Sequence, residues 1–356
     1  MKKICFIGFG LFTIGGCQRV TISLANNLCD KYETHLLSLC EIPKTHNYEV
    51  NEKIKVHTLG MPLDIRARHS LVVGLEIKKF LDKNNIDILF VAGSLPVPVV
   101  CALKPFVKTK IVFCDHENLA GRDKKSIFFR KIACKISDKV VVLTKQTLSD
   151  YKIKFNIKDE KISQIYNFID CNKFEKCDLN SKKIISVGRI SSEKGFDMAV
   201  EVANDVFGKH PDWQWHIYGD GPDMNKIKSK IKEYNLEDNL IMKGADSSVR
   251  DKYKDYSICV LPSYREGFAV VLLEARINSM PVVSFDCNSG PAEIINSEMD
   301  GYLIPCYNKK EMSEKICNLI ESLDLRKSFS SHAKDNLEKF SKNKIINQWV
   351  NLIESL

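Results

Sequence analysis

Short, continuous apolar runs alternate with longer amphipathic segments along almost the whole of this chain of 356 residues. Such runs are typical of parallel strands buried on both faces, and the amphipathic segments are typical of the helices that cover them. In the first half we expect strands at 2–10, 34–40, 86–93, 110–117 and 138–144. In the second half we expect strands at 182–190, 213–221, 239–245, 257–263 and 280–287. The pattern therefore predicts an α/β chain built on parallel sheets.

The alternation restarts near residue 181, after a turn-rich stretch of mixed charge at 167–183. A chain of this length typically forms two domains. We therefore expect two Rossmann-like, doubly wound parallel-sheet domains at 1–172 and 173–338, followed by a terminal helix at 339–356. Ligands of such sheets bind at the carboxyl ends of the strands, so functional residues are expected in the loops that follow strands.

The composition is that of an ordinary soluble protein, with 44% hydrophobic and 28% charged residues. No apolar stretch approaches the about 18 residues that a membrane-spanning helix needs. The start has two lysines and then an apolar run that breaks at glycines, so we interpret it as a first strand and not as a signal peptide. Thirteen cysteines without a CxxC pair indicate reduced thiols, and hence a cytoplasmic protein.

Positive charge is concentrated in the first half of the chain. The first 180 residues hold 29 basic and 19 acidic side chains, whereas the remainder hold 24 and 26. This imbalance indicates an anionic partner for the first half. Nucleic acid is not expected, because the basic half contains no motif that binds RNA or DNA.

Residues 121–139 combine this charge with apolar side chains. The pattern is typical of a basic amphipathic helix that lies on an anionic membrane surface. An ordinary surface helix with its apolar stripe in the core is the alternative. The residues concerned are Lys124, Lys125, Phe128, Phe129, Arg130, Lys131, Ile132 and Lys135.

The loop after the expected strand at 182–190 carries two cations close to glycines. Gly188 permits a close approach of the backbone, while Arg189 and Lys194 supply a planar fork and a point charge at one strand end. Such a pair is suited to bind a diphosphate. Two solvated surface cations would produce the same pattern.

A second loop, with the sequence SYREGFAVVLLEA, follows the expected strand at 257–263. A helix is expected to begin around 268–270, and the N–H groups at its start would attract phosphate. Glu266 precedes this helix and Glu274 lies about one turn inside it. Carboxylates repel a diphosphate, so their expected partners are the hydroxyls of the sugars that flank it. Alternatively, Glu266 is a helix cap and Glu274 a surface acid.

The third loop is GFGLFTIGGCQRV, near the start of the chain. Gly15 and Gly16 open an expected helix and would let backbone amides approach a phosphate. Gly8 and Gly10 also resemble the beginning of a dinucleotide fingerprint, but the third glycine of GxGxxG is missing, which weakens an NAD interpretation. Glycines that serve only the turn from strand to helix remain an alternative.

Taken together, these motifs resemble the retaining glycosyltransferases of family 4. The resemblance covers almost the whole chain: GG-x-x-R near the start, GR-x-x-x-x-KG, IYGDGPD, the EGFAVVLLEA motif and a closing helix that contains Trp349. The continuation PVVSFDCNSGPAEII is similar to that of bacterial enzymes that add hexose or N-acetylhexosamine units to lipid-linked oligosaccharides, capsule or lipopolysaccharide. The family implies a GT-B fold, in which two Rossmann-like domains face a cleft. The second domain then binds mostly the donor, the first mostly the acceptor, and the terminal helix crosses back to the first.

The resemblance also implies roles for single residues. Arg189 and Lys194 would bind the donor diphosphate and stabilise the departing nucleoside diphosphate. Glu266 would hold hydroxyls of the donor sugar, and Glu274 those of the ribose. His116 would lie near the donor sugar, with Asp115 and Glu117 beside it as further candidates, and 243–248 would be the base-binding loop. Donor contacts from the backbone are expected from Gly15, Gly16, Gly188, Gly267, Phe268, Ala269 and Val270.

The expected reaction needs no metal and no cofactor. The sequence contains no DxD triplet and no cluster of histidines or cysteines with metal-ligand spacing. The family implies transfer from a nucleotide sugar, here UDP-linked, with retention of the anomeric configuration and by a front-face route. The acceptor would be a glycan, lipid-linked, at the cytoplasmic face of the inner membrane. A GT-B sugar-nucleotide epimerase, an NAD-dependent oxidoreductase and a non-catalytic glycan-binding protein remain as alternatives.

Overall fold

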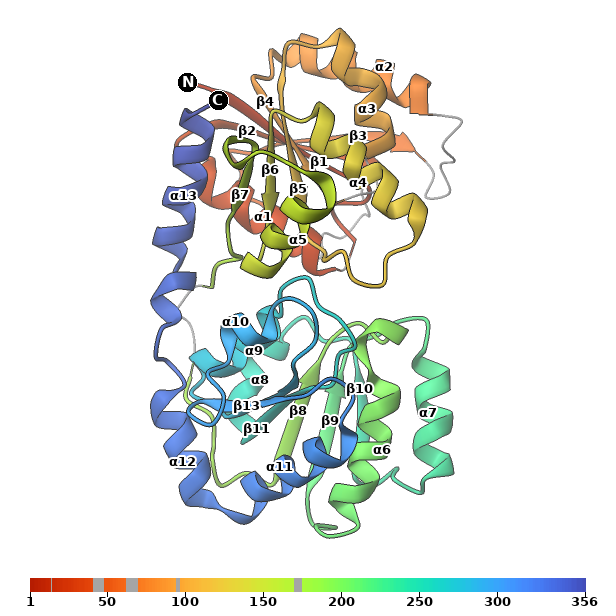
Figure 1. The fold of residues 1–356 in the computed structure, drawn as a ribbon, viewed down its shortest axis with the longest axis vertical. Helices are drawn as coiled ribbons and strands as arrows, with labels where there is room; N and C mark the ends of the chain where they lie inside the picture. Colours follow the sequence, from red (N-terminus) through yellow and green to blue (C-terminus); the bar gives the residue numbers. More distant parts are fainter. Residues whose placement is uncertain (14, 41–47, 62–69, 94–96, 170–174) are drawn as a thin grey trace. The chain divides into compact units, whose positions relative to one another are not determined.

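The computed structural model describes all 356 residues except 14, 41–47, 62–69, 94–96 and 170–174 (Figure 1). The chain divides into two compact units. Unit 1 consists of Met1–Asn167 and Asn343–Leu356, and unit 2 consists of Phe168–Lys342. The expected domain boundary at 172/173 lies outside the described residues, and the observed return of the chain to unit 1 comes a few residues after the expected position of 338/339.

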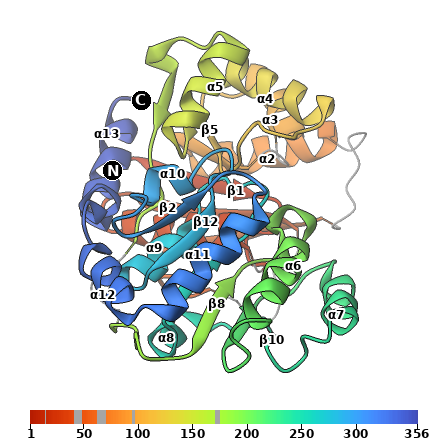
Figure 2. The same ribbon diagram turned by 60° about the horizontal axis from the view of Figure 1, so that its bottom comes forward.

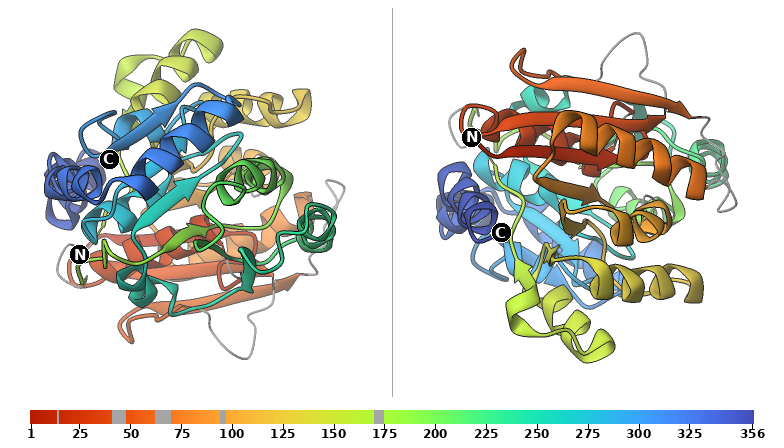
Figure 3. Two further views of the ribbon diagram at one scale, coloured as in Figure 1. Left: turned by 90° about the horizontal axis from the view of Figure 1, so that it is seen from below. Right: turned by 90° about the horizontal axis from the view of Figure 1, so that it is seen from above.

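Unit 1 is built on a parallel sheet with the strand order β3-β2-β1-β4-β5-β6-β7 (Figure 1). The strands are β1 (Lys3–Gly8), β2 (Glu33–Cys40), β3 (Lys55–Met61), β4 (Ile88–Ala92), β5 (Lys110–Asp115), β6 (Lys139–Val142) and β7 (Ile162–Gln164). The helices are α1 (Gly16–Leu28), α2 (Ser70–Asn84), α3 (Val97–Leu103), η2 (Lys104–Phe106), α4 (Lys124–Ile136), α5 (Lys145–Phe155), η3 (Asp159–Lys161) and the terminal α13 (Lys342–Glu354). Helices α2, α3 and α4 pack side by side (Figure 3, right).

The alternation of side chains along the strands gives the sheet of unit 1 two apolar faces. Cys5 and Ile7 belong to the core formed with α2, α3 and α4. Phe6 points to the opposite face, where its ring stacks on Phe90 at a centroid distance of 4.8 Å. Trp349 of α13 packs edge-on against Phe90 at 5.8 Å. The terminal helix is thereby part of the core of unit 1.

Unit 2 is built on a second parallel sheet, with the strand order β10-β9-β8-β11-β12-β13. The strands are β8 (Lys183–Val187), β9 (Gln214–Tyr218), β10 (Leu240–Gly244), β11 (Ile258–Leu261), β12 (Val282–Phe285) and β13 (Gly301–Ile304). The helices are η4 (Ser192–Lys194), α6 (Phe196–Phe207), α7 (Met224–Glu233), α8 (Val249–Lys252), η5 (Tyr253–Asp255), α9 (Val270–Ile277), α10 (Pro291–Ile294), α11 (Lys309–Glu321), α12 (Leu323–His332) and η6 (Leu337–Phe340). Helix α6 packs against α7 (Figure 2) and α11 (Figure 3, left).

The two parallel sheets agree with the predicted fold class, but three strands were not predicted. These strands are β3, β7 and β13, and each lies at the edge of its sheet. An edge strand has a neighbour on one side only, and β3 is exposed or half-buried along its whole length. Strands β3 and β7 lack the continuous apolar run on which the prediction was based, whereas β13 has only a short one, at 302–304.

The membrane-surface prediction for residues 121–139 is wrong in part, as the packing of α4 shows. Arg130, one of the predicted lipid-facing cations, is fully buried, and its Nε donates a hydrogen bond of 2.6 Å to Asp115. Phe129 packs against the core of unit 1. The exposed face instead consists of Lys124, Lys125, Phe128, Lys131 and Lys135, with Phe128 57% exposed. Among the described residues, no helix is both long enough and apolar enough to cross a bilayer.

Candidate donor-binding site

The candidate site is built by loops that follow the strands of unit 2. Because all six strands run parallel, the loops after β8, β9, β10, β11 and β12 leave the sheet at the same edge. Two of the three loops singled out in the sequence, 188–195 and 262–269, are among them. The third, with Gly15 and Gly16, opens α1 of unit 1.

The loops after β8 and β11 are locked together. The N–H of Tyr264 donates to the Glu193 carbonyl at 3.0 Å, and Arg265 forms an ion pair with the Glu193 carboxylate at 3.3 Å. Gly195 has a φ of 66°, and a Cβ on it would lie 1.9 Å from the carbonyl oxygen of Pro262. Only glycine can therefore occupy position 195 without moving the neighbouring loop.

Lys194 and Glu266, two predicted site residues 72 positions apart, are in direct contact. The Lys194 Nζ lies 2.8 Å from Oε1 and 2.9 Å from Oε2 of Glu266. The hydroxyl of Ser263 donates to the same Oε1 at 2.6 Å. Glu266 is only 7% exposed, so its carboxylate is held by charge-assisted hydrogen bonds in a mostly dry environment. The sequence did not single out Ser263.

The interpretation of Glu266 as a helix cap is wrong. Helix α9 begins at Val270, its N-cap residue is Ala269, and no side chain of the described residues caps it. In the turn before the helix, the N–H of Val270 donates to the Phe268 carbonyl at 2.9 Å, so this amide is engaged within the protein. The Phe268 ring packs against Phe340 at a centroid distance of 5.7 Å. That donor contacts come from Gly267, Phe268, Ala269 and Val270 stays a prediction.

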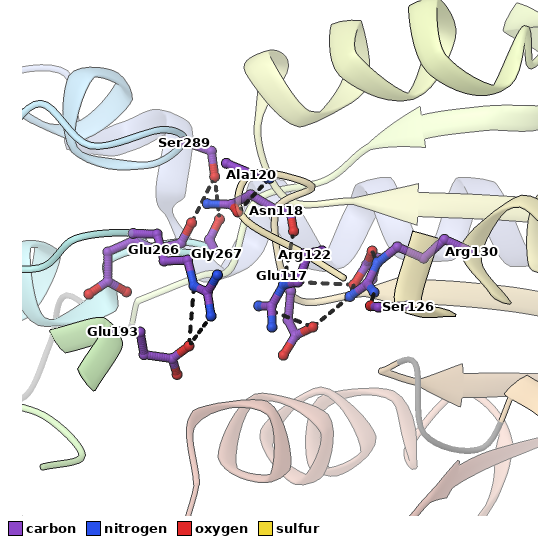
Figure 4. A network of polar contacts seen from close by, with 12 residues as sticks. Glu117, Asn118, Ala120, Arg122, Ser126, Arg130, Glu193, Glu266, Gly267 and Ser289 are labelled. Carbon is purple, nitrogen blue, oxygen red and sulfur yellow. Dashed lines mark hydrogen bonds and ion pairs between the residues drawn. The ribbon is translucent and has the colours of Figure 1, made fainter. Parts of the chain in front are cut away.

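The loop after β12 supports this turn from behind. The hydroxyl of Ser289 donates to the carbonyls of Glu266 at 2.9 Å and Gly267 at 3.3 Å (Figure 4). Gly290 has a φ of 109°, and a Cβ on it would lie 3.3 Å from the Ala269 nitrogen. The sequence offered a signal for this contact, because the GP dipeptide in SFDCNSGPAEII lies at the end of a predicted strand. Its partner could not be inferred from the sequence.

Glu274 is buried and paired with residues that sequence reasoning missed. Its side chain is on α9, it is 1% exposed, and its Oε1 accepts a hydrogen bond of 2.8 Å from Nε of Arg250. The hydroxyl of Tyr253 lies 3.4 Å from its Oε2. The interpretation of Glu274 as an exposed surface acid is therefore wrong. No spacing rule relates Arg250 to Glu274, because they belong to different helices.

Arg189 stands apart from these pairs. It is exposed, and within the described part of the chain its guanidinium has no hydrogen bond or ion pair. The loop that carries it is nevertheless fixed, because Ile190 donates to the Asp220 carbonyl at 3.0 Å and a Cβ on Gly219 would lie 1.8 Å from the Gly188 carbonyl oxygen. The backbone of this loop is thus fixed, whereas the Arg189 guanidinium pairs with no described side chain.

In unit 1, Gly15 and Gly16 differ in their surroundings. The hydroxyl of Tyr48 accepts from the Gly15 N–H at 2.8 Å and donates to the Gly15 carbonyl at 2.9 Å. A Cβ on Gly16 would have no atom within 4 Å. The packing of the described chain therefore does not require a glycine at position 16, and a donor contact at Gly16 stays a prediction.

His116 follows β5 between two acids that are committed to other partners. Asp115 forms the buried ion pair with Arg130 and also bonds Tyr151, while Glu117 pairs with Arg122 at 3.2 Å and with Arg130 at 2.5 Å (Figure 4). These contacts give Asp115 and Glu117 a structural role. Burial lowers the pKa of His116 to about 4, and its Nδ1 has no hydrogen-bond partner within the described residues. The imidazole is therefore neutral at neutral pH.

Among the described residues, no cluster of three or more His, Cys, Asp or Glu side chains could hold a metal ion. The cations near the acidic groups come from lysine and arginine. At the two predicted site glutamates of unit 2 these are Lys194, which pairs with Glu266, and Arg250, which pairs with Glu274.

Comparisons with known proteins identify the family of this chain. Residues 171–336 match the glycosyl transferases group 1 family, and residues 14–173 match Glycosyltransferase Family 4. The chain is 33% identical, over 77% of its length, to a poly(ribitol-phosphate) alpha-N-acetylglucosaminyltransferase of Staphylococcus aureus, and the match spans 56% of that protein. It is 26% identical, over 97% of each chain, to the N-acetylgalactosamine-N,N'-diacetylbacillosaminyl-diphospho-undecaprenol 4-alpha-N-acetylgalactosaminyltransferase of Campylobacter jejuni.

Among solved structures, a Staphylococcus aureus TarM variant in complex with fondaparinux, alpha-GlcNAc-glycerol and UDP has the same fold. The TM-score is 0.87 at 19% sequence identity, and the alignment covers 99% of both chains. Together the two family matches cover residues 14–336, which is most of the chain. The chain therefore belongs to the glycosyltransferases of the GT-B fold, with a family 4 domain followed by a group 1 domain.

Proposed function

We propose that this chain transfers a hexose or an N-acetylhexosamine from a UDP-sugar to a lipid-linked glycan acceptor in the synthesis of a bacterial surface glycan. The observation that carries the proposal is the contact between Lys194 and Glu266 at the carboxyl edge of the second sheet. Lys194 is a cation that can bind the donor diphosphate, and Glu266 is a carboxylate that can accept hydrogen bonds from sugar hydroxyls. The two side chains are hydrogen-bonded to each other. Such an arrangement fits the junction between a diphosphate and a sugar.

Each group has a chemical task in this reaction. Negative charge grows on the leaving diphosphate in the transition state, and Lys194 and the exposed Arg189 compensate it without a metal ion. Glu266 orients the donor sugar by accepting hydrogen bonds from its hydroxyls. Glu274 does the same for the ribose. The neutral imidazole of His116 can form a hydrogen bond with a hydroxyl of the donor sugar. Because it is uncharged, it adds no positive charge near the sugar ring, which becomes oxocarbenium-like in the transition state.

The donor and the acceptor are inferred from the relatives. The TarM structure contains UDP, which supports a UDP-sugar donor for this chain. The name of the Campylobacter jejuni relative, which aligns over almost the whole chain, specifies an undecaprenol-linked acceptor. That of the Staphylococcus aureus relative specifies poly(ribitol-phosphate). The two acceptors belong to bacterial surface glycan synthesis, which supports the same setting for this chain.

For the reaction itself we infer retention of the anomeric configuration by a front-face route. In this route the leaving phosphate helps to deprotonate the acceptor hydroxyl.

The test begins with UDP binding and with transfer from a panel of UDP- and GDP-sugars to undecaprenol-linked oligosaccharides. Wild-type enzyme should bind UDP and transfer from a UDP-sugar, equally well with a chelator present. The double variant Arg189→Ala/Lys194→Ala should lose transfer and bind UDP at least about tenfold more weakly, because two charge-assisted contacts are removed. Unchanged UDP affinity in this variant would contradict the clamp, and strict Mn²⁺ or Mg²⁺ dependence would contradict the metal-free route.

Glu266→Gln separates catalysis from folding. The amide can still accept from Ser263 but no longer attracts Lys194, so we expect a loss of activity of about 10² or more with only a small change in thermal midpoint. The matched control is Glu201→Gln on α6, which also removes a carboxylate bonded to lysine, here Lys230 at 2.7 Å. This control should keep its activity. Equal losses of stability and activity in Glu266→Gln would reduce Glu266 to a structural residue.

The same assays distinguish the alternatives. An epimerase would convert the free UDP-sugar without any acceptor, and an oxidoreductase would bind NAD in a titration. A non-catalytic glycan-binding protein would bind acceptor glycan but turn over no donor. Transfer that requires both substrates is the outcome expected here.

A further inference from the structure

Arg250 connects the short helix α8 with the buried Glu274. Its Nε donates a hydrogen bond of 2.8 Å to Glu274 Oε1, whereas its side chain is 45% exposed. One edge of the guanidinium is therefore anchored inside the protein, and the rest of the group reaches solvent. Within the described residues, its other N–H groups have no hydrogen-bond partner.

The backbone around Arg250 is held in place on both sides. In the loop that precedes α8, Asp246 accepts from the Ser248 N–H at 2.8 Å and pairs with Lys252 at 3.1 Å. After α8, the fully buried Tyr253 places its hydroxyl 3.4 Å from Glu274 Oε2. The direction of the Arg250 side chain is thus set by the loop after β10 and by α9 together.

The other cations of this segment behave differently. Lys252 pairs with Asp246 of its own loop, and Lys254 pairs with the exposed Glu175 at 3.1 Å. Arg250 alone among these three turns to a carboxylate that is itself almost fully buried and that we propose to hold the ribose. A simple surface ion pair would not need a buried partner.

We propose that Arg250 binds the nucleoside part of the donor, next to Glu274. This inference rests on the proposed function. A guanidinium has five N–H donors in a fixed plane, so one edge can fix Glu274 while the other donates to ribose or base oxygens. The nucleoside supplies such acceptors in the ribose hydroxyls and in the carbonyl oxygens of uracil. The diphosphate belongs to Arg189 and Lys194, which lie on a different loop.

Titration calorimetry with uridine monophosphate (UMP) and UDP on the whole protein tests this assignment. Arg250→Ala should weaken the binding of both ligands by the same factor, at least about tenfold, because the lost contact is common to both. Arg189→Ala/Lys194→Ala should weaken UDP much more than UMP. Lys254→Ala is the matched control, since it removes one cation from the adjacent turn and should leave both affinities unchanged.

A second comparison separates direct contact from mere positioning of Glu274. If Arg250 touches the nucleoside, Arg250→Ala should still weaken UMP binding in a Glu274→Gln background. No further loss in that background would overturn the proposal. Arg250→Lys is the second variant in case Arg250→Ala does not fold. It keeps the positive charge but lacks the planar guanidinium, so it should bind UMP more weakly than wild type.

The failures of the two proposals are distinguishable. If the wild-type protein binds neither UMP nor UDP, the proposed function is wrong. If wild-type binding is normal and Arg250→Ala and Arg250→Lys bind UMP like wild type, only the assignment of Arg250 is wrong. A loss for UDP without a loss for UMP would place the guanidinium at the diphosphate and would likewise overturn it.

Discussion

At the scale of single residues, two of the glycines that the motifs mark differ in their surroundings. Gly195 is required by the protein itself, because a Cβ would lie 1.9 Å from the Pro262 carbonyl oxygen and its φ is 66°. Gly16 has an open environment, because a Cβ there would have no atom within 4 Å. The sequence motifs mark both glycines equally. The structure shows that packing requires a glycine at position 195 but not at position 16.

This difference predicts opposite phenotypes for two alanine variants. Gly195→Ala should destabilise the protein by about 2 kcal/mol or more, because it combines a positive φ with a clash against backbone. Gly16→Ala should leave the free energy of unfolding within about 1 kcal/mol, since alanine favours a helix. Gly16→Ala should nevertheless lose transfer activity if the donor approaches this glycine. Urea unfolding and a transfer assay measure the two effects, and a fully active Gly16→Ala would remove Gly16 from the proposed site.

The candidate residues could be named from the sequence, but most of their partners could not. Lys194, Glu266 and Glu274 were selected because they follow strands in a known pattern. Tyr253 and Arg250 are ordinary residues by their local sequence, and only the fold brings them to Glu274. Ser263 lies three positions before Glu266, but nothing in its residue type marks it as a partner. Asp115 and Glu117 show the converse, since a strand-end position alone does not distinguish a site residue from a partner in a buried ion pair.

At the scale of elements, α4 illustrates how a basic amphipathic pattern divides between core and surface. Arg130 is drawn inside by Asp115, and Phe129 packs against the core, while four lysines and Phe128 remain on the surface. This exposed face keeps the features that favour an anionic lipid surface, an apolar side chain surrounded by cations. Peripheral contact with a membrane stays a prediction, and we now assign it to this face of α4.

Vesicle flotation can test this face of α4. The variant Lys124→Ala/Lys125→Ala/Lys131→Ala should bind vesicles rich in anionic lipid about 100-fold more weakly, since each lysine near such a surface contributes about 1 kcal/mol. The matched control replaces Lys226, Lys228 and Lys232, three exposed lysines of α7 in unit 2. Unchanged flotation of the α4 variant, or an equal loss in the α7 control, would exclude α4 as the docking face.

At the scale of the whole molecule, several histidines are kept neutral by burial. Burial lowers the pKa of His35 and His57, and it lowers the pKa of His116 and His216 to about 4. An unfolded histidine has a pKa of about 6.5. Between about pH 6.5 and pH 4, these histidines are therefore protonated in the unfolded chain but not in the native chain. Because the unfolded chain binds more protons, the free energy of unfolding must fall across this range as the pH decreases.

We expect the urea midpoint to be constant between pH 8 and 7 and to decrease steadily from pH 6.5 to 4.5. Carboxylates with a low pKa, such as Glu33 and Asp246 at about 2, do not account for a change above about pH 5, because their contributions are lost only below that pH. His216→Gln, which removes one of the titrating groups, should flatten the curve. A midpoint that is independent of pH over this range would show that the histidines are not buried in the native protein.

The two parallel sheets, the loops that carry the candidate site and its residue types could be predicted from the sequence. These properties are local: an apolar run reflects burial on both faces, and a glycine or cation after a strand reflects the edge where ligands bind. Tertiary structure alone decided which strands form the edges, that Arg130 is buried, and that Lys194 meets Glu266 and Arg250 meets Glu274. Those contacts join residues that are distant along the chain, and their formation depends on the packing of the whole unit, which no local pattern encodes.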